Sequence, residues 1–199
     1  MINPVINTNR REERPRDRVL SSDELRTIWR ALDNNDYGRI IKILALTGQR
    51  AGEIAGLRWS EVGDDVISLP GERTKNHRAH DIPLSPTVRE LLGARADRDL
   101  IFGQRGGPFT NWSKNKAALD ARTSLKHWVI HDLRRSVATG MADIGIQPHI
   151  IEAVLNHVSG HKGGIAGIYN RAQYSTEKAQ ALARWDEHVR AVVGMRGRP

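Results

Sequence analysis

The chain has 199 residues and a formal net charge of +8, which allows one domain with its own core and favours a polyanionic partner, most simply nucleic acid. Composition alone would also fit ribosomal or membrane-surface binding, but the absence of cysteine excludes disulfides and thiolate chemistry. The longest apolar run, Ile40–Leu46 interrupted by Lys42, is too short to span a bilayer, and no signal-peptide core is present, so a cytoplasmic protein is expected.

The first 19 residues have the composition of a linker. Pro4 and Pro15 interrupt an asparagine-rich and then mixed-charge stretch that ends near Arg18. Such a segment is more typical between two domains than at the start of one. We therefore expect residues 1–19 to be an interdomain linker remnant of a longer protein, and residues 20–199 to form one folded domain.

The first half of this domain shows helix signals followed by strand signals. Ser21 and Ser22 offer an N-cap to a helix with an apolar stripe, and Gly38–Thr47 is typical of a buried helix. Arg50–Leu57 is expected to form another helix. Two short strand-like runs, Val66–Leu69 and Ala79–Leu84, flank the polar, turn-rich stretch 70–78, which predicts a hairpin with a basic tip.

The second half is expected to consist of helices joined by loops. Ser85 is suited to cap a helix to Ala96 with Pro86 in its first turn, and Gln104–Pro108 is a loop. Further helices are predicted over Trp112–Ser124, His131–Ile144, Pro148–Leu155, around Ile165–Arg171, and over Thr176–Val192. The fold class is therefore mainly α with a small antiparallel β-sheet (α+β).

Six residues form a set suited to the attack of a phenol oxygen on a phosphodiester. Two arginines can hold the anionic phosphorus centre through paired hydrogen bonds, histidines or a lysine can move protons, and a tyrosine can form the covalent bond. No carboxylate cluster or metal-ligand spacing indicates a metal-dependent alternative, and we expect no metal and no cofactor. The set comprises Arg50, Lys75, His131, Arg134, His157 and Tyr169.

The same residues lie in motifs that resemble the tyrosine recombinases, the phage integrases. Thr47–Ile54 (TGQRAGEI) followed by Gly56–Trp59 is similar to their first box, and His131–Ser136 (HDLRRS) to their second. Leu155–His157 (LNH) and Tyr169 resemble the remaining motifs. The resemblance covers about Ser21–Val192, and it implies the DNA breaking-rejoining catalytic core over residues 20–199.

The resemblance implies a role for each position. Arg50 and Arg134 would clamp the phosphate, Tyr169 would be the nucleophile, and His131 and His157 would handle protons or bind phosphate. Lys75 would be the general acid for the departing 5′ oxygen, an assignment that rests on the family match because a lone lysine here would be a solvated turn residue. Glu53 would support the site by orienting an active-site base.

Two departures and one competing tyrosine bear on these assignments. Asn156 stands where the family most often has glycine, and Val158–Gly164 lengthens the segment before Tyr169. Both features resemble integrases of the prophage and genomic-island type. Tyr174 competes with Tyr169, but Tyr169 ends an apolar stretch among nearby glycines, whereas Tyr174 is more typical of a packing or surface residue.

The resemblance implies a site-specific DNA recombinase that forms a 3′-phosphotyrosyl intermediate and acts in DNA integration without ATP or metal. A type IB topoisomerase-like enzyme and a non-catalytic DNA-binding module are the alternatives. Expected partners are double-stranded attachment-site DNA, accessory DNA-bending proteins, and copies of the chain, monomeric when free and tetrameric on DNA, with no membrane. DNA contacts are predicted at Arg73, His77, Arg78, Lys114, Lys116 and Arg135, although a solvated helix face explains Lys114 and Lys116 equally well.

Overall fold

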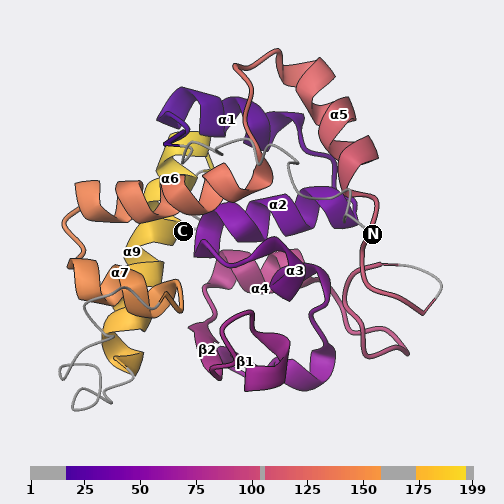
Figure 1. Ribbon diagram of the computed structural model, residues 1–199, viewed down its shortest axis with the longest axis vertical. Helices are drawn as coiled ribbons and strands as arrows, with labels where there is room; N and C mark the ends of the chain where they lie inside the picture. Colours follow the sequence, from indigo (N-terminus) through magenta and orange to yellow (C-terminus); the bar gives the residue numbers. More distant parts are fainter. Residues whose placement is uncertain (1–16, 104–105, 158–173, 196–199) are drawn as a thin grey trace, which may run out of the picture.

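The computed structural model describes residues 17–103, 106–157 and 174–195, and most of its elements are helices (Figure 1). Two strands pair antiparallel with Val66 opposite Pro83, which confirms the predicted class, mainly α with a small antiparallel sheet. Within the described part of the chain, no helix is long and apolar enough to span a membrane. The elements are α1 (Ser22–Ala31), α2 (Asp36–Thr47), α3 (Ala51–Ala55), η1 (Trp59–Glu61), β1 (Val66–Leu69), η2 (Gly71–Arg73), β2 (His80–Pro83), α4 (Pro86–Leu92), α5 (Trp112–Thr123), α6 (Ile130–Asp143), α7 (Pro148–Val154) and α9 (Ser175–Val193).

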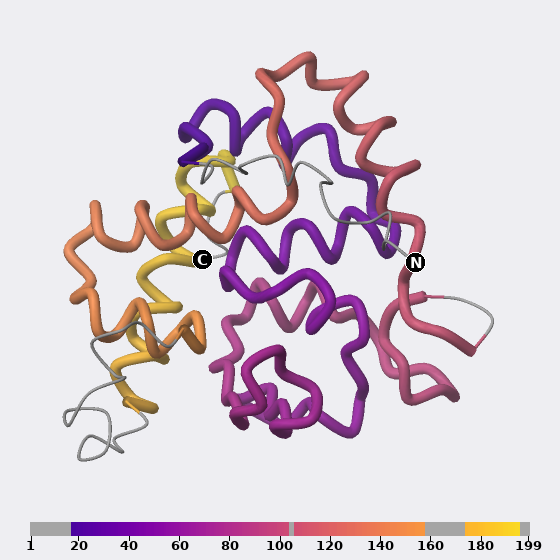
Figure 2. The backbone as a smooth tube through the Cα atoms, in the orientation of Figure 1, coloured from indigo at the N-terminus to yellow at the C-terminus, as the bar shows by residue number. Residues whose placement is uncertain are grey.

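Helix α2 runs through the centre of the domain and packs against α3, α4, α6 and α9 (Figures 1 and 2). Ile40, Ile41 and Ile43 are fully buried, so nearly every face of the helix meets another element, as predicted for this stretch. The helix begins two residues before the predicted start because the Asn35 side chain accepts a hydrogen bond from the Gly38 amide. These contacts make α2 the support for the segments that follow it.

Helix ends agree with the sequence where a local cap signal exists. The Ser85 hydroxyl accepts from the Val88 amide, as predicted, and starts α4. That helix ends at Leu92 and does not continue to Ala96, because Gly93 takes a positive φ of 76° that no helix accommodates. The predicted helix around residues 165–171 and most of the predicted linker, residues 1–16, lie outside the described residues.

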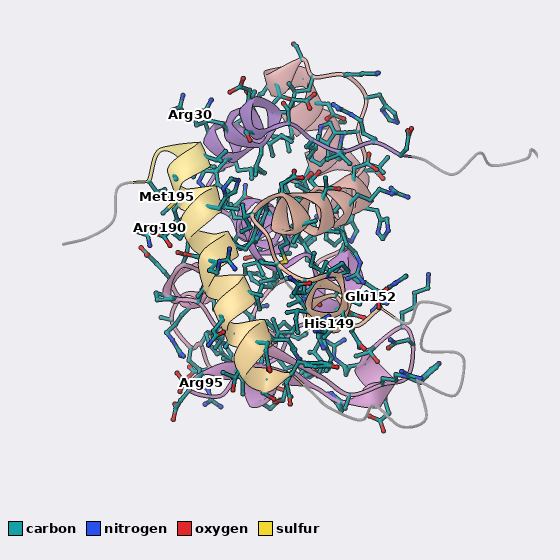
Figure 3. All side chains as sticks on the ribbon, turned by 90° about the vertical axis from the view of Figure 1, so that its left-hand side faces the viewer. Arg30, Arg95, His149, Glu152, Arg190 and Met195 are labelled. Atoms are coloured by element: carbon teal, nitrogen blue, oxygen red, sulfur yellow. The ribbon has the colours of Figure 1, made fainter. Side chains whose placement is uncertain are left out.

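The C-terminal helix α9 lies along one face of the domain and covers the ends of several elements (Figure 3). It packs against α1, α2, α7 and β2, and its Leu182, Trp185 and Val189 side chains are buried. The Trp185 indole Nε1 donates to the Ala45 carbonyl at 2.9 Å. The apolar edge of α9 is therefore buried within its own domain, and removal of this helix would expose the core.

Replacing Trp185 with alanine is expected to lower the free energy of unfolding by about 3–5 kcal/mol, because the change removes a buried ring and leaves a cavity beside α2. Urea unfolding followed by circular dichroism measures the difference. Glu187→Ala, on the exposed face of the same helix, should stay within about 0.5 kcal/mol of the wild type. A loss in Trp185→Ala as small as that in Glu187→Ala would show that Trp185 contributes little to the core.

Candidate active site

The segment that carries Arg50 is fixed by a tight turn at the end of α2. Gly48 takes a positive φ of 66°, and a Cβ there would lie 2.6 Å from the Leu155 side chain, so conformation and space both demand glycine. The buried Gln49 side chain donates to the last carbonyls of α2 and α7 at 2.8 and 2.9 Å. Arg50 therefore leaves the turn at a defined position, as the N-cap residue of α3.

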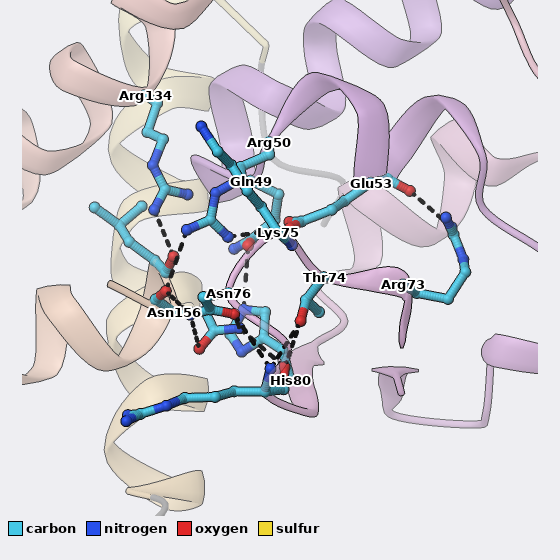
Figure 4. A network of polar contacts seen from close by, with 12 residues as sticks. Gln49, Arg50, Glu53, Arg73, Thr74, Lys75, Asn76, His80, Arg134 and Asn156 are labelled. Carbon is cyan, nitrogen blue, oxygen red and sulfur yellow. Dashed lines mark hydrogen bonds and ion pairs between the residues drawn. The ribbon is translucent and has the colours of Figure 1, made fainter. Parts of the chain in front are cut away.

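Two arginine side chains meet beside this turn (Figure 4). The Arg134 guanidinium, from the buried face of α6, donates to the Gly48 and Leu155 carbonyls at 2.8 and 2.5 Å. Arg50 donates to the Asn156 carbonyl at 3.4 Å. Burial and, second, the neighbouring Arg50 cation lower the pKa of Arg134, so the two like charges repel. An anion placed between them would relieve that repulsion.

The Glu53 carboxylate joins Arg50 to the hairpin. Its Oε1 atom accepts from the Arg50 guanidinium at 3.0 Å and from the Lys75 backbone amide at 3.2 Å. Its Oε2 atom is buried and has no hydrogen-bond partner among the described residues. One nearly buried acid thus balances part of the positive charge and sets the distance between α3 and the loop that carries Lys75.

Lys75 and the two histidines complete the cluster. Lys75 is exposed in the loop between η2 and β2, and His131 lies in the first turn of α6. Partial burial of the ring, followed by the cations Arg135, Arg134 and, last, Lys75, lowers the pKa of His131. His157 is exposed just beyond α7, where its amide donates to the Glu152 carbonyl. The lowered pKa of His131 favours its neutral ring, which is able to accept a proton.

Asn76 and Asn156 connect the hairpin to the end of α7. The Asn76 side-chain nitrogen Nδ2 donates to the Asn156 backbone carbonyl at 2.8 Å and to the Asn156 side-chain oxygen Oδ1 at 3.2 Å. In return, Asn156 Nδ2 donates to Asn76 Oδ1 at 3.2 Å. Each asparagine is the chain neighbour of a candidate catalytic residue, Lys75 or His157. The structure thus brings together Arg50, Glu53, Lys75, His131 and Arg134, and it places His157 directly after Asn156, whereas Tyr169 lies outside the described residues.

Three of the predicted DNA contacts are engaged within the domain. The Arg73 guanidinium donates to Glu61 at 2.7 Å, and Arg135 donates to the buried carboxylate of Asp132 at 2.8 Å. Lys116 pairs with Asp120 at 2.5 Å and lies 4.1 Å from the centre of the Trp128 ring. These internal contacts occupy hydrogen-bond donors of Arg73, Arg135 and Lys116 that would otherwise be available to a DNA phosphate. The DNA contacts of these three residues stay predictions.

The other three predicted DNA contacts remain at the surface. His77 and Arg78 are exposed at the hairpin tip, next to the cluster. Lys114 is exposed on α5, which Figure 1 shows at the opposite end of the domain from the hairpin. The structure therefore separates these residues into a group near the cluster and one distant lysine. Their role in binding stays a prediction.

His80 lies next to the candidate site, although no motif in the sequence indicates it. It is 4% exposed on the core-facing side of β2, and its Nε2 lies 3.1 Å from Gln49 Oε1. Because Gln49 Nε2 donates to two carbonyls, its oxygen faces the ring and His80 donates this hydrogen bond. The alternation of the strand was the available signal, since it places residue 80 on the same face as Ile82.

Burial is the main cause that lowers the pKa of His80 to about 3, and the cations Lys178 and Arg134 act in the same direction. The Val154 carbonyl and Asp81 act in the opposite direction but do not outweigh burial. His80 is therefore neutral in the folded protein under all ordinary conditions. Its ring serves as a buried polar link between β2 and the turn before Arg50.

Tyr174, the alternative nucleophile, is described and has a structural position. It is the N-cap residue of α9 in the left-handed conformation, with φ of 49°. Its ring lies 5.3 Å from that of His149 on α7. These contacts fit the packing role expected for this tyrosine. The assignment of Tyr169 as nucleophile stays a prediction.

Comparison with known proteins identifies a family. The phage integrase family model matches residues 18–176. Prophage integrase IntA of Escherichia coli K12 is 27% identical over 94% of this chain and 49% of its own length, and prophage integrase IntF of the same strain is 28% identical over 87% and 38%. The chain thus spans half or less of the length of these curated relatives.

Solved structures show the same fold. The integrase from mycobacterium phage Brujita superposes with a TM-score of 0.68 at 18% identity, covering 91% of this chain and 65% of that one. The lambda integrase catalytic core gives a TM-score of 0.56 at 20% identity, covering 70% of this chain and 94% of that one. The described domain therefore has the fold of an integrase catalytic core, which confirms the expectation from the motifs.

His80 should make stability depend on pH in a predictable direction. The unfolded chain binds a proton near the ordinary histidine pKa of about 6.5, whereas the folded protein resists protonation until about pH 3. The contribution of this group is therefore complete above pH 6.5 and is lost as the pH falls, with a slope of up to about 1.4 kcal/mol per pH unit. Urea unfolding between pH 7 and 4 measures it, and His80→Asn, which does not titrate, should show a shallower slope. An equal pH dependence of the free energy of unfolding in the wild type and His80→Asn would contradict the low pKa assigned to His80.

Proposed function

Because the chain belongs to the phage integrase family, we propose that its domain cleaves and rejoins DNA as a tyrosine site-specific recombinase. The observation that carries this proposal is the meeting of Arg50 and Arg134 beside the loop of Lys75 (Figure 4), with His131 at the start of α6 and His157 just beyond α7. These groups supply anion binding and proton transfer, and Tyr169 supplies the nucleophile. The products are recombined DNA strands in an integration reaction.

The arginines act on the phosphate. In the transition state the phosphorus gains a fifth oxygen ligand, and negative charge grows on the non-bridging oxygens. Arg134 is held by two carbonyls and Arg50 by Glu53, so both guanidinium groups keep their places before charge develops. Preorganised donors of this kind need no rearrangement during the reaction, and this is why they lower its barrier.

Protons and bonds balance in each half of the reaction. The Tyr169 oxygen forms a bond to phosphorus and gives up its proton to a base, for which His131 is suited by its lowered pKa. The bond from phosphorus to the 5′ oxygen breaks, and Lys75 protonates that oxygen. A 5′ hydroxyl of the partner strand then gives its proton to Lys75 and bonds to phosphorus, while the bond from phosphorus to the Tyr169 oxygen breaks and that oxygen regains its proton from His131. One phosphodiester is exchanged for another, so the chemistry requires neither ATP nor a metal ion.

The proposed partners are attachment-site DNA and further copies of this chain. Relatives of the same fold include a lambda integrase tetramer bound to a Holliday junction and XerH bound to its difH substrate. We propose a monomer in free solution and a tetramer on DNA, with accessory DNA-bending proteins. The exposed His77 and Arg78 at the hairpin tip would contact DNA beside the scissile phosphate.

Tyr169→Phe should abolish the covalent protein–DNA adduct and leave DNA binding nearly unchanged, because only the hydroxyl is lost. The measurement uses suicide DNA substrates in excess chelator, with adducts resolved on a denaturing gel. Tyr174→Phe is the matched control and should form the adduct like the wild type.

Loss of the adduct in Tyr174→Phe alone would reassign the nucleophile. A strict requirement for magnesium in wild-type cleavage would contradict the recombinase assignment and indicate a metal-dependent nuclease. An adduct that forms and reseals without exchanging strands would indicate a topoisomerase.

Lysine substitutions at the two arginines should separate catalysis from stability. Arg50→Lys is expected to cut the cleavage rate roughly 10²-fold, because lysine cannot bind two oxygens at once, yet it keeps a cation beside Glu53. Arg134→Lys should lower both the cleavage rate and the free energy of unfolding, the latter by about 1–3 kcal/mol, since lysine lacks the two separate nitrogens with which the guanidinium reaches the two buried carbonyls. Single-turnover cleavage and urea unfolding measure these effects. Wild-type stability of Arg134→Lys would refute the carbonyl anchor.

A further inference from the structure

Two asparagines form a reciprocal amide pair between segments 80 residues apart in the chain (Figure 4). Asn76 and Asn156 exchange hydrogen bonds through their side chains, each 3.2 Å long, and the Asn76 amide also donates to the Asn156 carbonyl at 2.8 Å. Asn76 directly follows Lys75, and Asn156 directly precedes His157. The pair therefore joins the two backbone segments that present these residues.

Further hydrogen bonds from the same two side chains fix the loop conformation. Asn156 Nδ2 donates to the Arg78 carbonyl at 3.3 Å, and Asn76 Oδ1 accepts from the Arg78 amide at 3.4 Å. The Asn156 carbonyl also accepts from Arg50 at 3.4 Å. One residue at the end of α7 thus contacts the hairpin and the phosphate-binding arginine at the same time.

The backbone of Asn156 explains why an asparagine can stand here. Its φ is 47°, in the left-handed region that glycine adopts freely and asparagine tolerates better than other residues. Glycine would meet the backbone requirement but would supply no amide. The side chain is therefore what asparagine adds at this position.

The hairpin has a separate anchor on its other side. The Arg73 guanidinium donates to Glu61 at 2.7 Å and to the Gly56 carbonyl at 2.7 Å, and these contacts hold η2 against α3 and η1. Folding of the hairpin is therefore supported without the asparagines. What the amide pair adds is the position of the loop relative to α7 and Arg50.

We propose, resting on the function above, that Asn76 and Asn156 are positioning residues for the proton transfer from Lys75. By tying the loop to the α7 end, the pair holds the Lys75 ammonium on the side of Arg50 and His131, where the departing 5′ oxygen would lie. Neither asparagine needs to touch the reacting atoms. Loss of the pair would leave the phosphate clamp intact and weaken only the delivery of the proton.

The test compares two substrates that differ in the leaving atom. One carries the normal scissile phosphodiester, and the other has sulfur in place of the bridging 5′ oxygen, which departs as a thiolate without needing a proton because its pKa is far lower. Asn156→Gly and Asn76→Ala should cleave the oxygen substrate roughly ten- to hundred-fold more slowly than the wild type, as expected for a misplaced acid. Both should cleave the sulfur substrate at the wild-type rate.

Three further variants serve as references for the cleavage rates on the two substrates. Lys75→Ala should show the same pattern with a larger loss, and Arg50→Lys should be slow on both substrates. Asn34→Ala, an exposed asparagine between α1 and α2, should match the wild type on both. Equal losses on the two substrates for Asn156→Gly, or no loss on either, would overturn the positioning role.

Hydrogen exchange supplies a readout that does not depend on cleavage. Amides of residues 71–79 should exchange faster in Asn156→Gly than in the wild type, while those of α2 and α6 stay unchanged. Unchanged exchange in the hairpin would overturn the inference. If the wild type forms no adduct with either substrate, the proposed function fails, and the exchange experiment still decides whether the amide pair holds the loop.

Discussion

The buried guanidinium of Arg134 joins the segments on which the site is built. It bridges the Gly48 carbonyl just after α2 and the Leu155 carbonyl just after α7, while its own backbone belongs to α6. Carbonyls at helix C-termini have no partner within their helix, and the helix dipole makes these ends favourable for a cation. The arginine therefore stabilises the packing of three helices and is oriented by it.

This arrangement concentrates positive charge that the fold balances only in part. Arg50, Arg134 and Lys75 lie around the single acid of Glu53, and burial, followed by the repulsion of neighbouring cations, lowers the pKa values of Arg134 and His131. Structural ion pairs would bring equal numbers of opposite charges together. A cluster with surplus cations held by backbone carbonyls has its lowest energy when an anion enters, and strongly perturbed groups of this kind gather at functional sites.

Local signals in the sequence were enough to predict most elements. The strand Val66–Leu69 has the predicted bounds, and the cap at Ser85 starts α4, because alternation and caps act within a few residues. The candidate arginines, histidines and Lys75 were found through motifs. Their convergence follows from the fold, since contacts that assemble them join residues 106 and 86 positions apart in the chain.

The sequence was less informative about which partner a side chain contacts when that partner is not a neighbour in the chain. Arg73 and Lys116 were expected to face DNA because they are basic residues in polar stretches, yet Glu61 and Trp128 engage them. Asn156 was visible only as a departure from the glycine usual in the family. Its partner Asn76 cannot be found from spacing, because the hydrogen bond depends on how α7 meets the hairpin.

Two sets of hydrogen bonds link the hairpin to α7, one buried and one partly exposed to water. This difference in burial affects how firmly Lys75 is held. The inner link is buried, where His80 on β2 bonds Gln49, whose amide donates to the last carbonyl of α7. The outer link, Asn76 to Asn156, is only partly buried, so water competes for its hydrogen bonds and their net contribution is small. The strand is thus fixed at its base, while the loop beyond it is held by contacts weak enough to be remade. A general acid needs both properties, because it must stay near the phosphate and still adjust to the leaving oxygen as DNA binds.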